Sequence, residues 1–309
     1  MTLRSESYSP PLRVRELPFD LRKAIVLEDP ASLARDFGPT VFLEFLSLNM
    51  IAEFAETLLY YLNRTHGMMA DQAESRTFVH QELRHAGALH VVNRWLVKDD
   101  YVLTEFGRLS GLCQAVRAPL LLELRAAAQD DSRRPELLRR LSLEIAAFET
   151  TFGLLAQVPQ FDLLADSPEQ FLKHPVFSYV TFYHAAEEAE HIHVSWQHHQ
   201  RTYGQDIFEV DHIPSLIAVM ERLFDEITRM TFLVAQRVGQ TITLEAVEAS
   251  PPAQARRRML EQLAGGRFHP EYYTELRRSC VESWDGFWEP QFRQAVEERL
   301  SRAPAANTI

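Results

Sequence analysis

Apolar residues recur every three to four positions in several long runs of the chain, which is the spacing of one face of an α-helix. In the stretch 38–64 they stand at positions 42, 43, 46, 50, 54, 58 and 61. Further runs of this kind predict helices over residues 71–97, 103–128, 135–158, 168–203 and 215–238. Strand-like alternation and the Asn-Gly signal of a hairpin are absent from the sequence, so the pattern predicts an all-α protein.

Breaks in this pattern divide the chain into three parts of a single domain. Residues 1–37 are rich in proline and charge, and we expect an irregular N-terminal arm. Residues 38–205 hold the longest periodic runs, and we expect them to form a helical bundle. Residues 206–309 are helical in pattern but interrupted by pairs of proline and of glycine, so we expect accessory C-terminal helices packed on the bundle.

The charge distribution argues against nucleic acid as a partner. The formal net charge is −11, and the short arginine clusters stand beside acidic residues. A phosphate-binding surface needs a basic stripe, which the sequence does not contain. No apolar run approaches the roughly 20 residues that a bilayer crossing needs, so a membrane-spanning segment is not expected.

The cysteine content and the amino terminus predict a cytoplasmic protein. The two cysteines, Cys113 and Cys280, are far apart in the sequence and do not form a disulfide framework. Residues 1–15 mix arginine, glutamate, serine and proline, and contain no apolar core of a signal peptide.

The pattern Glu-x-x-His is the main chemical signal in the chain. A glutamate and a histidine three residues apart on a helix project from the same face and can bind one metal ion. Roughly one copy is expected by chance at this histidine content. The sequence has Glu82/His85, Glu188/His191, Glu190/His193 and Glu209/His212.

The first two copies lie on apolar stripes of their helices. Glu82 and His85 share the stripe that runs through residues 78–96, and Glu188 and His191 lie beside large apolar residues of the helix over 168–203. Ionisable groups on an interior stripe are costly unless they are paired or bound to a metal. Both pairs are therefore candidate metal ligands.

The other two copies are weaker candidates. Glu190 and His193 share a face with Glu187 and Gln197, and we expect that face to be solvated. The fourth copy lies in a loop bounded by glycine and proline, where the spacing does not place both side chains on one helical face.

A dinuclear carboxylate site in a four-helix bundle also needs one glutamate on each of two further helices. Glu53 lies on a stripe of the first long helix, and its spacing of 29 residues from Glu82 suits two antiparallel helices that cross at mid-length. Glu56, on the neighbouring stripe, is the alternative. In the helix over 135–158, Glu149 lies on an apolar stripe, with Glu144 as the alternative.

The order of these pieces along the chain predicts the fold. Glutamate and Glu-x-x-His come first, the helix over 103–128 follows, and glutamate and Glu-x-x-His come again. Ferritin-like bundles have one long crossover connection between their two halves. We therefore expect a ferritin-like four-helix bundle with residues 103–128 as the long crossover helix.

Two stretches, YHAAEEAEHIHVSW and FVHQELRHAGALHVVN, resemble a family of ferritin-like proteins labelled predicted metal-dependent hydrolases. That family has a His-x-x-Glu-Glu-x-Glu-His segment, a Gln-Glu-x-x-His segment and a Phe-His-Pro segment, which residues 267–270 resemble. The chain is also similar to the p-aminobenzoate N-oxygenase family of diiron enzymes. There an extra histidine, four residues before the last Glu-x-x-His glutamate, joins the metal shell, and His184 stands in that place.

His184 is one helical turn from Glu188, which favours a metal ligand over a hydrogen-bonded core histidine. The aromatic residues Tyr179 and Tyr183 on the same helix are candidates to wall a substrate cavity, although core packing would also explain them. The complete set of candidate ligands is Glu53, Glu82, His85, Glu149, His184, Glu188 and His191.

Carboxylate and imidazole ligands with open positions suit iron, and manganese is possible. The resemblance to the N-oxygenases implies a non-haem diiron oxygenase that uses two iron ions and O2 to oxygenate a small-molecule amine in biosynthesis. It also implies an external electron donor such as a ferredoxin or a flavin reductase. Alternatives are a dinuclear metal-dependent hydrolase, a diiron carbon hydroxylase and, least favoured, non-enzymatic iron binding. We expect a homodimer.

Overall fold

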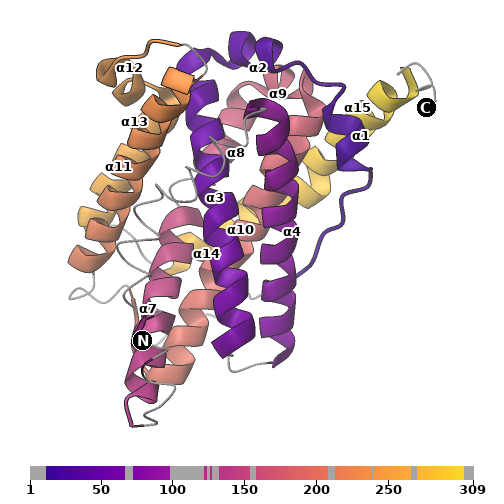
Figure 1. The fold of residues 1–309 in the computed structure, drawn as a ribbon. Helices are drawn as coiled ribbons and strands as arrows, with labels where there is room; N and C mark the ends of the chain where they lie inside the picture. Colours follow the sequence, from indigo (N-terminus) through magenta and orange to yellow (C-terminus); the bar gives the residue numbers. More distant parts are fainter. Residues whose placement is uncertain are drawn as a thin grey trace.

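The computed structural model describes residues 12–66, 72–97, 122–123, 126, 132–153, 158–207, 213–237, 240–265 and 270–302. Every regular element within these ranges is a helix (Figure 1). The all-α prediction is therefore confirmed for this part of the chain. The helix expected over residues 103–128 lies almost entirely outside the described residues, as do Cys113, Phe268 and His269.

Four long helices form the centre of the protein. α3 (Pro39–His66) packs along α4 (Gln72–Val97), and α7 (Arg134–Phe152) packs along α10 (Pro175–Tyr203) (Figure 1). α10 also contacts α4, and this contact joins the two pairs. α11 (Ile213–Arg237) lies against both α3 and α7. Among the described helices, none combines the length and the apolar character that a membrane crossing requires.

The N-terminal part of the chain is more regular than its composition suggests. It contains α1 (Leu21–Ile25) and α2 (Pro30–Phe37), so the expectation of an irregular arm is wrong for these residues. The side chain of Asp29 accepts hydrogen bonds from two backbone N–H groups at the start of α2, and Pro30 occupies its first turn. This cap and proline together are a typical start signal for a helix.

The single helix expected over residues 168–203 is broken near its start. α8 (Val158–Asp166) and α9 (Pro168–Leu172) precede the break, and α10 begins only at Pro175. Proline disfavours helical backbone in the residue before it, and His174 has φ −125° and ψ 61°. The break therefore follows from Pro175, which then occupies the first turn of α10.

The C-terminal helices cover the outer side of α10. α14 and α15 both contact α10, and Trp284 packs between them against the rings of Phe182 and Phe292. Together with α4 and α7, these helices enclose α10. The C-terminal elements are α12 (Leu244–Glu248), α13 (Pro251–Ala264), α14 (Pro270–Ser283), the π-helical turn η3 (Trp284–Trp288) and α15 (Glu289–Arg302).

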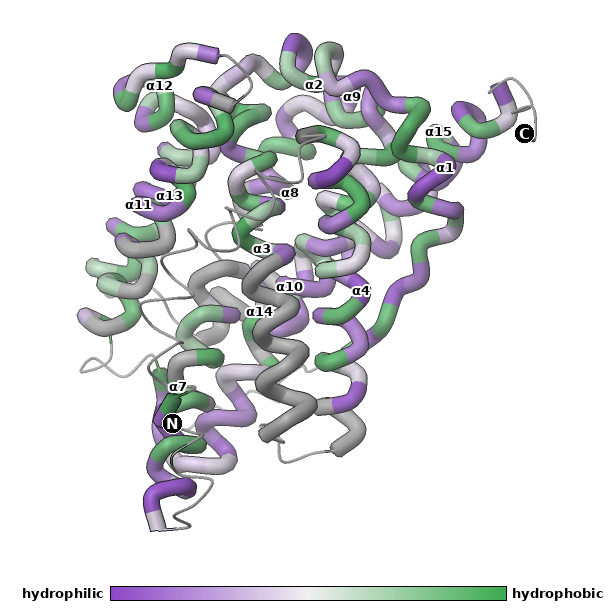
Figure 2. The backbone as a smooth tube through the Cα atoms, in the orientation of Figure 1, coloured by the Kyte–Doolittle hydropathy of each residue, from purple (hydrophilic) through white to green (hydrophobic). Residues whose placement is uncertain are grey.

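α10 is unusual because it is both enclosed and polar. Every residue from His174 to Ile192 is buried, yet this helix carries hydrophilic residues along its length (Figure 2). A helix buried on all sides is normally apolar all round. Buried polar groups without compensation cost free energy, so the charged residues of α10 need partners inside the protein.

Candidate metal centre

Six of the seven candidate ligands lie together in the middle of the bundle. α4 contributes two, α7 contributes one and α10 contributes three. At most 2% of the surface of each residue is exposed. The six are Glu82, His85, Glu149, His184, Glu188 and His191.

The first group of donor atoms surrounds the ring of His191. Its Nδ1 atom lies 3.1 Å from Glu82 Oε1, 3.3 Å from Glu149 Oε2 and 3.3 Å from Glu188 Oε1. One atom from each of these four residues lies within 4.8 Å of the others, a separation that a single metal ion can span. Three helices therefore direct ligand atoms at one point.

The second group shares an atom with the first. Glu188 Oε1 lies 3.2 Å from His85 Nδ1 and 3.3 Å from His184 Nε2. Donor atoms of these three residues are again within 4.8 Å of one another. Because the same carboxylate oxygen belongs to both groups, Glu188 lies between two adjacent positions for a cation.

The close approach of α7 to α10 depends on Gly153. A Cβ atom at this position would lie 2.5 Å from Ile192 Cγ1 and 3.3 Å from the backbone oxygen of Glu188. Any other residue would therefore require the Ile192 side chain or the helices to shift. Glu149 lies one turn before Gly153 on α7, so the glycine allows its carboxylate to reach His191.

A second layer of side chains holds the two Glu-x-x-His histidines by their outer nitrogens. His85 Nε2 lies 2.7 Å from Glu187 Oε2. Because an ionised carboxylate only accepts hydrogen bonds, Nε2 carries the hydrogen and Nδ1 faces the cluster. Outer acceptors of this kind fix the tautomer and the orientation of metal-binding histidines.

Gln81 holds His191 in the same way. Its Nε2 donates to Glu190 Oε2 at 3.1 Å and to the Arg13 backbone oxygen at 3.2 Å. Its amide oxygen therefore faces His191 Nε2, at 3.2 Å, and accepts the ring hydrogen. Nδ1 of His191, like Nδ1 of His85, is left to face the carboxylates.

Arg15 of the N-terminal segment joins the outer acceptors. Its guanidinium group lies 2.7 Å from Glu190 Oε1 and 2.9 Å from Asp285 Oδ1, and its backbone N–H donates to Glu187 Oε1 at 2.6 Å. Burial alone would lower the pKa of Arg15, but hydrogen bonds and charges of Asp285 and Glu190 outweigh it and raise the pKa. The group is therefore a fixed positive charge.

These contacts correct one prediction. The face of α10 that carries Glu187 and Glu190 was expected to be solvated, but the two residues are 0% and 1% exposed. The N-terminal segment covers that face through Arg15, which precedes Glu187 by 172 positions and Glu190 by 175. Local periodicity does not contain this information, although the acidic run itself marks a region of dense charge.

Burial and mutual charge shift the pKa values of the cluster strongly. Burial raises the pKa of Glu82 to about 8. Burial also opposes ionisation of Glu188, but neighbouring His191, His184 and His85 outweigh it and lower its pKa well below the usual value. The pKa of His191 is raised well above its usual value because Glu188 and the neighbouring carboxylates outweigh burial.

The inner atoms fit a cation better than they fit one another. Within the described residues, both carboxylate oxygens of Glu82, Glu188 Oε1 and His191 Nδ1 are buried and make no aligned hydrogen bond. They nevertheless lie at 3.1–3.3 Å, in the ion-pair contacts given above. Buried polar atoms in proteins are almost always hydrogen-bonded. Carboxylate and imidazole atoms that converge on one point in this way are compatible with metal binding.

Glu53 is the one candidate ligand that the structure places elsewhere. Its carboxylate accepts a hydrogen bond from Asn93 Nδ2 at 2.8 Å and lies 2.8 Å from His90 Nδ1, and its side chain is 24% exposed. The side chains of its alternative, Glu56, and of Glu144 lie outside the described residues. His193 and the Glu209/His212 pair lie outside them as well.

No protein-family model, curated protein or solved structure matches this chain. The interpretation of the site therefore rests on the side-chain geometry. That geometry shows a buried cluster of three carboxylates and three imidazoles whose composition and spacing are compatible with metal binding.

Proposed function

We propose that this protein is a non-haem diiron oxygenase whose cluster binds two iron ions in a ferritin-like bundle. The observation that carries the proposal is the position of Glu188 Oε1, which is shared by two groups of ligand atoms. A carboxylate between two cation positions is the central feature of a dinuclear carboxylate site.

The two groups suggest a ligand assignment. Glu82, Glu149 and His191 would hold one ion, His85 and His184 would hold the other, and Glu188 would contribute to both. The assignment gives three carboxylates for two divalent ions, whereas four would neutralise them. Dinuclear bundles take the fourth from the remaining helix, which is α3 here.

Glu56 is the best candidate for the α3 carboxylate. Asn93 of α4 contacts the Asn49 backbone oxygen and Glu53 of α3, so the two helices are antiparallel with residues 49–53 opposite 90–93. Continuing this register along both helices would bring the backbone of Glu56 opposite residues 86–87, next to His85. Glu53 is one turn too early, which explains why it contacts His90 instead.

When bound, the ferrous ions would supply the chemistry for activating O2 and for the two-electron oxidation of an organic nitrogen. The chain itself would orient His85 and His191 through Glu187 and Gln81, and would keep water from the ions. Phe78, whose ring centroid lies 4.4 Å from that of His191, belongs to the apolar wall on one side. An external electron donor would reduce the ions again, and the substrate would be a small amine.

A hollow of about 280 Å³ between α1, α4 and α10 provides an approach for the substrate. Leu21 and Val91 are part of its mainly apolar lining, and Tyr183 forms its inner end. The Tyr183 ring meets the His85 ring edge-on, with 5.5 Å between centroids. Small-molecule sites are typically apolar hollows of this kind.

The first experiment is elemental analysis of protein produced with iron, together with an optical spectrum after anaerobic reduction and exposure to O2. Close to two iron ions per chain and a visible band that appears only with O2 would support the proposal. Bound zinc or manganese with no response to O2, and metal-supported cleavage of a substrate, would favour the dinuclear hydrolase. Protein that takes up no metal would overturn the whole interpretation.

A further inference from the structure

Arg15 is in contact with the outer acceptors of both Glu-x-x-His histidines, although it touches neither histidine itself. Its backbone N–H donates to Glu187, the residue that accepts from His85. Its guanidinium pairs with Glu190, which accepts from Gln81, the residue that accepts from His191. One residue of the N-terminal segment is thus linked to one histidine of each ligand group.

Both links depend on the position of Arg15. Arg15 is 9% exposed, and its guanidinium group is held from the other side by Asp285, at 2.9 Å and 3.0 Å. Two guanidinium–carboxylate contacts with one Asp have the fork geometry that fixes an arginine in orientation as well as position. Glu187 and Glu190 are both fully enclosed, so removal of Arg15 would leave two buried carboxylates without their only nearby guanidinium among the described residues.

We propose that Arg15 is a positioning residue for both metal positions, acting through Glu187 on His85 and through Glu190 and Gln81 on His191. The inference rests on the proposed function for the presence of the metals. Its specific content is that a residue outside the bundle sets the orientation of both imidazoles, and hence the affinity and geometry of both ions.

Cobalt(II) is the probe that tests this inference, because its visible absorption reports the geometry of its ligands as well as its binding. In Arg15→Met we expect cobalt affinity to fall by about 10- to 100-fold, the usual loss when an outer partner of a metal ligand is removed. The cobalt absorption bands should also shift, since loss of the guanidinium group frees Glu190 and Gln81 and allows the ring of His191 to turn, whereas the backbone N–H of residue 15 still holds Glu187 beside His85. Arg15→Lys keeps the positive charge but loses the two-point contact with Asp285. Its cobalt affinity should therefore lie between those of wild-type protein and Arg15→Met.

The matched control is Arg256→Met. Arg256 is also buried, at 6% exposed, and pairs with the buried carboxylate of Glu44 at 2.9 Å on α3, outside both ligand groups. This variant should lose stability while its cobalt affinity and spectrum remain those of the wild type. A loss of stability alone therefore does not account for the result expected for Arg15→Met.

A double-mutant cycle between Arg15→Met and Glu190→Gln tests the route. If Arg15 acts through Glu190, the two losses of cobalt affinity should be clearly less than additive. Should Arg15→Met fail to fold, Arg15→Lys and Glu190→Gln carry the test. Wild-type affinity and spectrum in the Arg15 variants would overturn the inference alone, whereas a wild-type protein that binds no cobalt would overturn the proposed function with it.

Discussion

α10 carries two buried groups of histidine and carboxylate side chains, one at its start and one at its middle. At the start, His174 Nε2 lies 3.0 Å from Asp36 Oδ2, and its Nδ1 lies 3.4 Å from Glu28 Oε2. Glu28 also accepts from the Val176 backbone N–H at 2.9 Å and pairs with Arg299 Nη1 at 2.6 Å. A guanidinium group and a backbone donor thus satisfy this carboxylate from within the protein.

The middle group has the same kinds of side chain but a different balance between carboxylates and positively charged groups. Three carboxylates face three imidazoles, and the ion pairs of Glu82 and Glu188 given above are with histidine rather than with arginine or lysine. The nearest guanidinium, that of Arg15, lies one layer further out. The comparison shows that a buried histidine beside carboxylates does not itself mark a metal site. The distinguishing feature is a surplus of carboxylate groups whose only cationic neighbours in the contacts given above are histidines.

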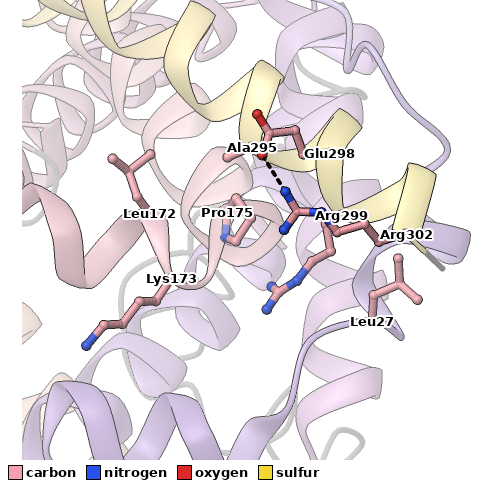
Figure 3. Close-up of a pocket in the computed structure, with 8 residues that line it drawn as sticks. All are labelled: Leu27, Leu172, Lys173, Pro175, Ala295, Glu298, Arg299 and Arg302. Atoms are coloured by element: carbon pink, nitrogen blue, oxygen red, sulfur yellow. Dashed lines mark hydrogen bonds and ion pairs between the residues drawn. The ribbon is translucent and has the colours of Figure 1, made fainter.

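The hollows beside the two groups also differ, both in their charged residues and in their distance from the cluster. Figure 3 shows the hollow at the start of α10, of about 470 Å³, with the guanidinium groups of Arg299 and Arg302 beside Pro175. Arg302 pairs with Glu298 and Arg299 with Glu28, so both guanidinium groups of this hollow already have carboxylate partners. It also lies about 20 Å along the helix from the cluster, at 1.5 Å per residue. The hollow at Tyr183 is next to the cluster, because the Tyr183 ring that lines it also contacts the ring of His85.

The largest expected difference between the two groups is in metal content. Glu188→Ala removes the oxygen shared by both ligand groups and should abolish binding of both ions, measured by elemental analysis and metal titration. Glu28→Ala removes the central carboxylate of the group at the start of α10 and should reduce stability while both ions stay bound. Two bound ions in Glu188→Ala, or loss of the ions in Glu28→Ala, would contradict the distinction.

Removal of metal should destabilise the protein through the middle group alone. A metal that binds only the folded state adds about 2.7 kcal/mol to the free energy of unfolding at a free concentration one hundred times its dissociation constant. Thermal unfolding with and without a chelator measures this increment. Glu28→Ala should show the same increment from a lower baseline, and Glu188→Ala should show none. Equal melting temperatures for wild-type protein with and without metal would count against a bound ion.

Gly153→Ala should disturb the middle group through the helix contact rather than through a ligand. Its Cβ would lie 2.5 Å from Ile192, and overpacking of this kind costs about 1–3 kcal/mol. We expect lower stability in denaturant and weaker metal binding, because Glu149 moves away from His191. A second change, Ile192→Ala, makes room for the new methyl group and should restore part of the metal affinity. Unchanged affinity in Gly153→Ala would show that Glu149 is not needed.

Gly87 lines the hollow at Tyr183, and a Cβ there would meet nothing within 4 Å. Gly87→Phe should fill the hollow without displacing neighbours, and should slow release of ferrous iron to a chromogenic chelator while leaving metal content unchanged. Ala295→Phe in the hollow at the start of α10 is the control and should leave that rate unaltered. Equal rates for both variants would show that the approach to the cluster lies elsewhere.

The smallest expected effect is a difference in the sign of pH dependence. In metal-free protein the pKa of Glu82 is raised from 4.5 to about 8. The folded state therefore keeps a proton that the unfolded chain loses, and the free energy of unfolding falls as pH rises from 4.5 towards 8. Denaturant unfolding between pH 4.5 and 6.5, below the range in which the raised pKa of His191 adds a slope of the same sign, should show the slope in wild-type protein and its loss in Glu82→Gln.

The group at the start of α10 should show the opposite sign. His174 lowers the pKa of Asp36 below its model-peptide value of 3.8. The stability that this contact contributes is present above that value and is lost as pH falls through the lower, folded pKa. Asp36→Asn should remove this acid-side loss without changing the slope between pH 4.5 and 8, which denaturant unfolding from well below pH 3.8 up to pH 8 would check.

The sequence was sufficient for four of the long helices and for the candidate ligands that share a helix. Periodic apolar positions predicted α3, α4, α7 and α11 closely, because these helices are long and bury one continuous side. Glu82 with His85, and Glu188 with His191, could be found because i and i+3 positions lie on one helical face. Glu149 could be found because its neighbours in sequence are apolar.

The remaining features depend on contacts between distant parts of the chain. The choice between Glu53 and Glu56 depends on how α3 is placed along α4, and a single stripe does not determine that register. The outer layer was missed because Arg15 and Glu187 are brought together only when the N-terminal segment crosses α10. The break before α10 was missed even though Pro175 marks it locally, because the apolar period continues across it.

The contacts of Arg15 also imply an order of events during synthesis. Asp285, which holds its guanidinium, follows 270 residues later in the chain. At ribosomal elongation rates of about 5–20 residues per second, that interval is roughly 15 to 55 s. α4, α7 and α10 are complete before Asp285 has been added, so the bundle that contains the ligands can assemble while the N-terminal segment has yet to be fastened over it. The newly made protein therefore has a period of seconds in which the outer side of the cluster lacks its final cover.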